Sequence, residues 1–209
     1  MKTQATGCFI TFEGVDGAGK STQIALLAEA LRARGRNVLC TREPGGTELG
    51  EKLREVLLGM AMHVDTEAML MFAARREHLA AVIEPALAAG TWVVCDRFTD
   101  ATYAYQVGGR GLEAVRCDAL EAWVHPHLKP DLTLLFDLSP ALAAARMQAN
   151  GVEPDRFERE QRGFFERVRA AYLDRARREP GRFHVIDAAR EPQAIAREIA
   201  SVLGERTWL

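Results

Sequence analysis

The chain has 209 residues, and its 27 lysine and arginine side chains nearly balance its 29 aspartates and glutamates, for a formal charge of −2. This balance argues against a protein that binds nucleic acid or a membrane surface through a general basic patch. The length suits a single domain over residues 1–209, and neither an apolar stretch of ~20 residues nor a signal-peptide pattern is present.

Short apolar runs alternate along the chain with longer helical patterns. Strands are predicted at Cys8–Phe12, Asn37–Thr41, Trp92–Asp96, Leu132–Asp137 and Phe183–Asp187. Helices are predicted at Gln23–Arg34, Glu48–Leu58, Thr66–Ala89, Leu112–Val124, Pro140–Gln148, Glu158–Arg178 and Pro192–Gly204. Because the strands are continuously apolar, we expect a parallel sheet with helices on both faces, the α/β class with right-handed crossovers. Ligands should then gather at the carboxyl ends of the strands.

The four cysteines, Cys8, Cys40, Cys95 and Cys117, do not have the spacing of a metal site. Three of them fall in predicted strands. We therefore expect reduced, buried thiols in a cytoplasmic protein.

The most specific motif, GVDGAGKST, directly follows the first predicted strand and precedes a predicted helix. It satisfies the phosphate-loop pattern G-x-x-x-x-G-K-[S/T], in which backbone N–H groups and a helix N-terminus surround phosphate oxygens. The lysine can reach the outer phosphates of a nucleoside triphosphate, and the serine hydroxyl suits Mg²⁺. The predicted ATP-binding residues are Gly14, Val15, Asp16, Gly17, Ala18, Gly19, Lys20, Ser21 and Thr22.

Two further strands end in charged, motif-like loops. The second strand leads into Arg42-Glu43-Pro44-Gly45-Gly46, which predicts a rigid turn with a cation at the sheet edge. The third ends in Asp96, which resembles the acidic group that orients Mg²⁺ and its waters. Arg97 beside it could hold a second phosphate with its planar guanidinium.

With these motifs in place, the sequence resembles the bacterial thymidylate kinase family. The matching stretches run nearly end to end, as FITFEGVDGAGKST, TREPGGT, LMFAARREH, DRFTDATYAYQ, GGRG, DLTLLFDLSP and DRFE. The resemblance implies a P-loop NTPase α/β/α fold with a five-stranded parallel sheet and a small mobile lid at about residues 146–157. It also implies a homodimer that transfers the γ-phosphoryl group of ATP to dTMP, with Mg²⁺ as the cofactor.

The resemblance further implies roles for individual residues. Asp16 would approach the 3′-hydroxyl and phosphate end of dTMP, Phe72 would stack on thymine, and Arg76 would hydrogen-bond the base O4. Arg97 would hold the dTMP phosphate, with Asp96 on the Mg²⁺ side. The remaining implied contacts are Thr102 at the base N3 edge, Tyr105 against the sugar C2′, Gln106 supporting the nucleotide, and Arg42 and Glu43 along the phosphate and magnesium region.

Two departures from the family pattern concern the base and the lid. Ala101 stands where many relatives carry serine, which would remove a hydrogen bond near the base. Gly17 stands where some members place a catalytic arginine in the phosphate loop. We therefore expect arginines of the lid to serve catalysis, with Arg146 and Arg156 as the candidates; the sequence leaves open which of them contacts the transferring group.

Other interpretations of the same residues remain open at this stage. A kinase for a different nucleoside monophosphate would keep the phosphate loop but change the base contacts. A GTP-driven switch would need an Asn-Lys-x-Asp motif, which the chain lacks. Phe72 could be an ordinary core residue, and Arg76 could lie on the solvated edge of its helix. The segment Thr66–Ala89 is too apolar for one buried stripe, so it is either core or interface. Following the resemblance, we expect one face of it to pack on the sheet and another to pack across a two-fold axis.

Overall fold

The computed structural model describes residues 7–149, 156–157, 162–206 and 208. The strands are β1 (Phe9–Glu13), β2 (Val38–Arg42), β3 (Trp92–Asp96), β4 (Leu132–Asp137) and β5 (Phe183–Asp187). The helices are α1 (Lys20–Ala33), α2 (Glu48–Gly59), α3 (Val64–His78), α4 (Glu84–Ala88), α5 (Thr99–Thr102), α6 (Ala114–Val124), α7 (Pro140–Ala149), α8 (Arg162–Arg178) and α9 (Pro192–Glu205). Two π-helical segments, η1 (Leu79–Ile83) and η2 (Tyr103–Gly109), complete the elements.

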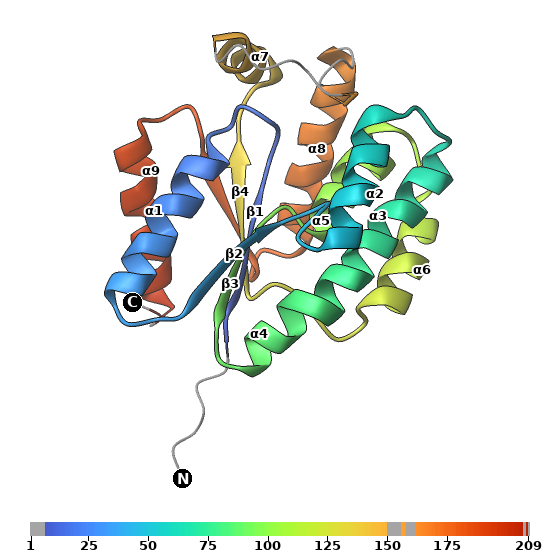
Figure 1. Cartoon of the computed structure of the whole chain (residues 1–209). Helices are drawn as coiled ribbons and strands as arrows, with labels where there is room; N and C mark the ends of the chain where they lie inside the picture. Colours follow the sequence, from blue (N-terminus) through green and yellow to red (C-terminus); the bar gives the residue numbers. More distant parts are fainter. Residues whose placement is uncertain (1–6, 150–155, 158–161, 207, 209) are drawn as a thin grey trace.

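The five strands form one all-parallel sheet in the order β2-β3-β1-β4-β5, which confirms the expected α/β fold. Phe12 pairs in register with Asp96 on β3 and with Leu134 on β4. The carboxyl ends of the central strands therefore meet at one edge of the sheet (Figure 1). The loops that follow these strands come together there, as a doubly wound sheet requires.

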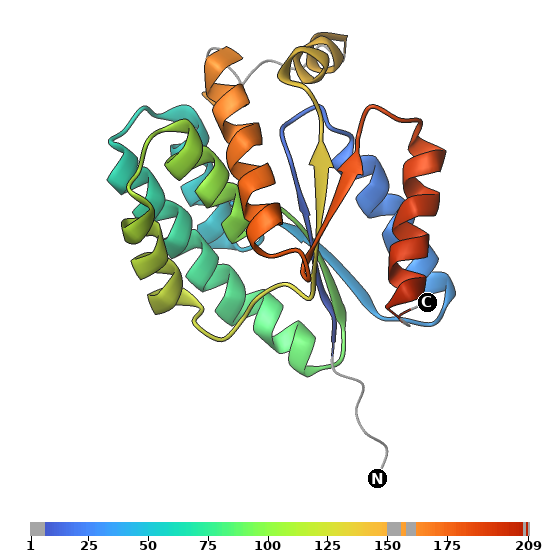
Figure 2. The ribbon, with the colours of Figure 1, turned by 180° about the vertical axis from the view of Figure 1, so that it is seen from behind.

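Helices cover both faces of the sheet. On one face α1 packs against α9, and on the other α8 and the α2, α3 and α6 group lie together (Figures 1 and 2). Strands β1, β3 and β4 are buried along almost their whole length, because they lie between the two helical layers. Helix α7 lies beyond the carboxyl ends of the strands. The sheet is thus the rigid platform from which the loops of the site project.

The segment predicted as one helix, Thr66–Ala89, is interrupted in the structure. Helix α3 continues into η1 and then α4, so the apolar run is helical throughout but contains a π-helical segment. Pro85, the second residue of α4, lies two positions after the end of η1 and has no N–H to donate to the carbonyl four residues earlier. A locally widened turn accommodates such an imino residue. Hydrophobic periodicity alone does not reveal this change.

Residues 99–109, which none of the predicted helices or strands covers, form α5 and η2. The segment packs extensively along α8. A Cβ atom at Gly109 would lie 2.4 Å from the Phe164 ring, so glycine is what allows η2 to approach α8 so closely. Tertiary packing thus stabilises a helical conformation that the Thr-, Tyr- and Gly-rich sequence disfavours locally.

The four cysteines are free, but the expectation that all are buried is wrong for Cys40. This residue lies on β2, an edge strand with one side open, and is exposed. Cys8 is buried but precedes β1 rather than lying in it. Within the part of the chain described above, no helix is both long and apolar enough to cross a membrane.

Candidate active site

The phosphate loop runs from the end of β1 to the start of α1, as the motif predicted. Gly19 caps the helix with a φ of 86°, a left-handed conformation that favours glycine. Lys20 is only 6% exposed, and its ammonium donates to the carbonyls of Gly14 and Val15 at 3.1 Å each. Burial lowers the pKa of Lys20, and the nearby positive charge of Arg97 lowers it further. The ammonium is thus held inside the loop where a polyphosphate chain would bind.

A cavity of about 500 Å³ opens in front of this loop. Its lining residues are Asp16, Gly17, Gly19, Lys20, Ser21, Thr22, Asp96, Arg146 and Ala149. Val15 and Ala18 turn their side chains into the core, so only their backbone could contact a ligand. Asp96 Oδ1 is buried without a hydrogen-bond partner at this site. A buried carboxylate oxygen in that position fits an environment in which a cation or its water supplies the missing contact.

Arg97 lines a second cavity, which shares Asp16 with the first. Its backbone has a φ of 68°, a strained conformation for a residue other than glycine. Its guanidinium donates to Asp16 Oδ1 at 2.7 Å and to the hydroxyls of Tyr105 and Tyr172 at 3.2 Å each. Partial burial would raise the pKa of Asp16, but the charges of Arg97 and Lys20 lower it to about 2. The carboxylate therefore stays ionised between two cations.

The second cavity lies beside Arg97, among the segments that follow β2 and β3 and the facing side of α3. It is lined by Asp16, Glu43, Pro44, Arg54, Leu58, Met71, Arg75, Arg97, Phe98, Ala101, Thr102, Tyr105, Gln106 and Phe157. Apolar side chains form much of the wall, and a few polar groups converge on it, as is usual for a small-molecule site.

Arg75 is the buried cation of this second cavity. It is 2% exposed, and it donates to Glu43 Oε2 at 2.7 Å and to Thr102 Oγ1 at 3.2 Å. Burial would raise the pKa of Glu43, but the charge of Arg75 and contact with His78 lower it below its usual range. The remaining nitrogen of Arg75, Nη1, is buried without a hydrogen-bond partner. This orphaned donor is suited to a polar ligand atom in the cavity.

Asp16 lines both cavities. Its carboxylate forms an ion pair with the Arg97 guanidinium and lies 4.0 Å from the Lys20 ammonium. Two ligands bound in the two cavities would therefore meet at a point lined by a carboxylate and two cations. This arrangement is suited to moving a charged group from one ligand to the other.

Comparison with known proteins agrees with this geometry. The thymidylate kinase family model matches residues 12–199. The chain belongs to the thymidylate kinase family. It is 61% identical to the thymidylate kinase of Ralstonia nicotianae over 95% of this chain and 98% of that protein. The thymidylate kinase of Methylobacillus flagellatus is 57% identical, with the same coverage. The crystal structure of thymidylate kinase from Ehrlichia chaffeensis superposes with a TM-score of 0.78 at 36% identity, covering 95% of this chain and 99% of that one.

Family membership confirms the resemblance recognised in the motifs, and the structure places most of the predicted residues in the two cavities. Residues predicted for the acceptor side that line the second cavity are Asp16, Glu43, Arg97, Thr102, Tyr105 and Gln106. Arg42 does not line it; its side chain is exposed and pairs with Glu51 at 2.8 Å. At the carboxyl end of β2 the side chains alternate in direction, so Arg42 points away where its neighbour Glu43 points inward.

Phe72 and Arg76 are the main corrections among the predicted site residues. Phe72 is 1% exposed and stacks on His125 in the core, and Arg76 lies on the surface with Glu84. The cavity is instead lined by Met71 and Arg75, one position earlier in the chain. One residue corresponds to about 100° around a helix. The sequence offered no means to choose between the two adjacent arginines.

The two candidate lid arginines lie in different places. Arg146 lines the first cavity and donates to the Ala188 carbonyl at 2.9 Å. Arg156 donates to Glu67 at 2.5 Å and to the Leu57 carbonyl at 3.1 Å, next to the second cavity. Residues 150–155 of the predicted lid lie outside the described residues.

Gly17 explains why the phosphate loop of this member of the thymidylate kinase family carries no arginine of its own. It has a φ of 78°, and a Cβ atom there would lie 2.7 Å from the Ala143 carbonyl of α7. A larger residue would require both a strained backbone and a shift of α7.

Several lining residues were not predicted from the sequence. They include Pro44, Arg54, Leu58, Met71, Arg75, Phe98 and Phe157. Arg54 reaches the cavity from α2 and donates to the Pro44 carbonyl at 2.9 Å. The sequence did not single out Arg54 as a site residue, because charged residues such as Arg54 and Glu51 are ordinary members of an amphipathic helix.

Proposed function

We propose that this chain transfers the γ-phosphoryl group of ATP to dTMP, giving ADP and dTDP. The observation that carries the proposal is the pair of cavities joined at Asp16, with the phosphate loop in one and Arg97 in the other. Membership of the thymidylate kinase family supports the choice of both substrates.

ATP would bind with its phosphates against the loop amides and Lys20. Mg²⁺ would be held by the Ser21 hydroxyl and ATP oxygens, with Asp96 orienting its water ligands. No group of three or more His, Cys, Asp or Glu side chains with metal-site geometry occurs among the described residues. Mg²⁺ usually keeps several waters and substrate oxygens as ligands, so it needs few ligands from the protein. The bound ion would neutralise charge on the transferring phosphates.

dTMP would occupy the second cavity with its phosphate on Arg97. The orphaned Arg75 Nη1 is suited to donate to a carbonyl oxygen of the base, and Met71 to pack on the base ring. Tyr105 is held by Arg97 and Asp16, with the Arg97 guanidinium 4.9 Å above its ring. A ring fixed in this way next to the sugar would disfavour a 2′-hydroxyl.

Catalysis would consist mainly of positioning and neutralisation of charge. Phosphoryl transfer passes through a loose transition state with charge spread over the equatorial oxygens. Lys20 on the donor side and Arg97 on the acceptor side would hold the two phosphates in line, and Arg146 is suited to contact the transferring group. Phe157 packs on Tyr105 with their ring centroids 5.8 Å apart, and this contact would help to exclude water.

An acceptor panel tests this function. ADP release from ATP and Mg²⁺ is measured with dTMP, dUMP, UMP, CMP, AMP and GMP in turn. We expect dTMP to be preferred, dUMP to be slower because one methyl group contributes about 1–3 kcal/mol, and UMP to be poorest. Turnover of UMP equal to that of dTMP would contradict the role of Tyr105, and turnover of a purine nucleotide alone would refute the function.

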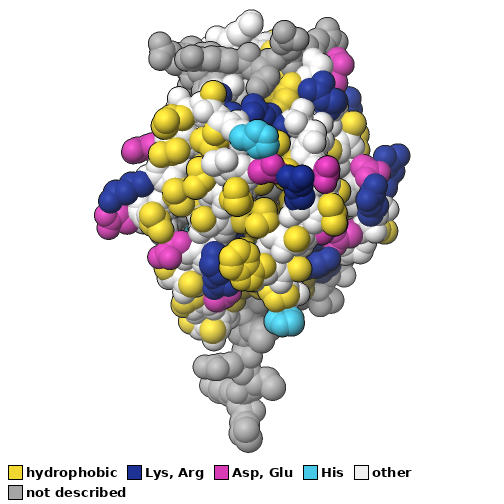
Figure 3. All heavy atoms as spheres, turned by 90° about the vertical axis from the view of Figure 1, so that its right-hand side faces the viewer, with side chains coloured by type: hydrophobic (Ala, Val, Ile, Leu, Met, Phe, Trp, Pro, Cys, Tyr) yellow, Lys and Arg dark blue, Asp and Glu magenta, His cyan; other side chains and the backbone are white. Residues whose placement is uncertain are grey.

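We also propose a homodimer, formed through α2 and α3. Both helices expose apolar side chains, namely Leu49, Val56 and Met69 at 37–53% exposure, and Met60 directly after α2 is 60% exposed. Figure 3 views the corresponding side of the molecule and shows hydrophobic side chains spread across it. A two-fold axis would bury such a surface against its copy.

The four free cysteines suit a cytoplasmic enzyme, where thiols stay reduced.

A further inference from the structure

Arg97 is held in its strained conformation by contacts on both sides of its backbone. Its N–H donates to the Phe12 carbonyl at 2.9 Å, and the next N–H, that of Phe98, donates to Glu13 Oε1 at 2.7 Å. A positive φ at a non-glycine residue is strained and persists only where the surroundings enforce it. Glu13 therefore fixes the peptide that directly follows Arg97.

The other oxygen of Glu13 reaches the side chain of Arg97 through a tyrosine. Tyr172 of α8 donates its hydroxyl to Glu13 Oε2 at 2.8 Å, and the same hydroxyl oxygen accepts from Arg97 Nη1 at 3.2 Å. Both Glu13 and Tyr172 are buried, at 0% and 1% exposure. The carboxyl group thus holds Arg97 twice, once through the Phe98 amide and once through the Tyr172 hydroxyl and the guanidinium.

Glu13 itself lines neither cavity, so it is not placed to contact a substrate. Burial raises its pKa to about 8, and Asp100 raises it too, while Arg97 and the hydrogen bonds from Tyr172 and Phe98 lower it. A buried carboxyl group is costly to keep unless its hydrogen bonds are needed. The hydrogen bonds that Glu13 accepts from the Phe98 amide and the Tyr172 hydroxyl are the contacts that offset this cost.

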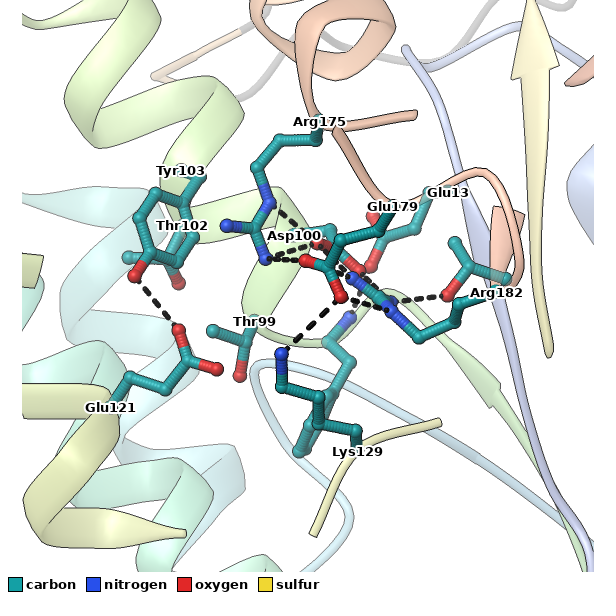
Figure 4. A network of polar contacts seen from close by, with 12 residues as sticks. Glu13, Thr99, Asp100, Thr102, Tyr103, Glu121, Lys129, Arg175, Glu179 and Arg182 are labelled. Carbon is teal, nitrogen blue, oxygen red and sulfur yellow. Dashed lines mark hydrogen bonds and ion pairs between the residues drawn. The ribbon is translucent and has the colours of Figure 1, made fainter. Parts of the chain in front are cut away.

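The cations behind Glu13 are directed elsewhere. Figure 4 shows Asp100 between Arg175 and Arg182, with Glu13 close by. Asp100 forms ion pairs with Arg175 at 2.8 Å and with Arg182 at 2.7 Å, so these two guanidinium groups neutralise its charge. Glu13 instead faces Arg97, through Tyr172.

We propose that Glu13 is a positioning residue that holds Arg97, through Tyr172 and the Phe98 amide, in register with the phosphate loop. Glu13 is the last residue of β1, and the loop begins at the next position, Gly14. One side chain would therefore align the acceptor clamp with the segment that binds the donor. This inference rests on the proposed function, since it assigns the acceptor phosphate to Arg97.

Two variants remove the two ends of this connection. Glu13→Gln keeps the shape and can still accept from Phe98, but its amide nitrogen cannot accept the Tyr172 hydroxyl. Tyr172→Phe removes only that hydroxyl. Asp137→Asn is the matched control, because Asp137 also ends a strand and pairs with an arginine, Arg169 at 2.6 Å, outside both cavities.

Steady-state kinetics, calorimetric dTMP binding and thermal unfolding are measured for the three variants and for the Glu13→Gln/Tyr172→Phe double variant. We expect kcat/KM for dTMP to fall about 10- to 100-fold in each connection variant, while KM for ATP stays within about twofold. The double variant should lose little more than the worse single variant, since both act through one chain of contacts. Asp137→Asn should match the wild type.

The outcomes separate the role of Glu13 from the function itself. If dTMP kinetics of the folded Glu13→Gln and Tyr172→Phe proteins stay within about twofold of wild type, the positioning role is wrong. Equal losses for ATP and dTMP, or additive losses in the double variant, would also overturn it, because they indicate a general structural defect. If Glu13→Gln does not fold, Tyr172→Phe decides alone. A wild-type protein that does not phosphorylate dTMP would refute the proposed function instead.

Discussion

Replacing Arg75 with lysine should impair use of dTMP strongly, although the charge is kept. Arg75 donates to Glu43 at 2.7 Å and to Thr102 at 3.2 Å, and its third nitrogen, Nη1, is buried without a hydrogen-bond partner. A lysine can keep the pairing with Glu43 but cannot reproduce the planar set of donors. Loss of one charge-assisted hydrogen bond to the base contributes about 1.5–3 kcal/mol, which corresponds to a fall of about 10- to 150-fold in kcat/KM for dTMP.

The matched control is the neighbouring arginine. Arg76→Lys changes a half-exposed side chain that pairs with Glu84 on the surface, so kcat/KM for dTMP should stay within about twofold of wild type. Both variants are assayed by coupled ADP release over a range of dTMP concentrations, with calorimetric dTMP binding. Lysine is preferred to alanine at position 75, because breaking the buried Arg75–Glu43 pair by removing the cation would cost about 3–5 kcal/mol of stability and obscure the result. A larger loss for Arg76→Lys than for Arg75→Lys would refute the assignment of the base contact.

Five further variants have expected outcomes. Arg97→Lys should lower kcat/KM for dTMP about 30- to 1000-fold with little change in KM for ATP, whereas Lys20→Ala should abolish ATP use but leave calorimetric dTMP binding intact. Arg146→Ala should lower kcat about 100-fold without changing dTMP affinity, and an unchanged single-turnover rate would contradict its contact with the transferring group. Burial would raise the pKa of Glu179, but neighbouring guanidinium groups lower it from 4.5 to about 2, so its contribution to stability is present above pH 4.5 and is lost as the pH falls toward 2. The melting temperature of Glu179→Gln should therefore depend less on pH in that range than that of the wild type. Met69→Asp should shift the light-scattering mass toward one chain of 23.1 kDa, and a wild type that is itself only that size would remove the dimer.

The sequence was sufficient wherever the signal was contiguous along the chain. The strands at Trp92–Asp96, Leu132–Asp137 and Phe183–Asp187 were predicted with the bounds that the structure has. The phosphate loop was predicted from its spacing, because a strand, a glycine-rich turn and a helix start must follow one another in that order. Asp96 and Arg97 could be placed at the site because parallel strands bring their carboxyl ends to one edge.

Only the tertiary structure decided how side chains are directed. Whether Arg75 or Arg76 enters the cavity depends on the rotation of α3 against the sheet, which adjacent arginines in one helix do not encode locally. The role of Glu13 depends on contacts with Phe98, after β3, and with Tyr172 of α8, up to 159 positions away in the chain. Local patterns determine which backbone conformation is favourable. The packing of elements distant in sequence determines which side of each element faces the ligand, because burial and hydrogen bonding are satisfied only in the assembled fold.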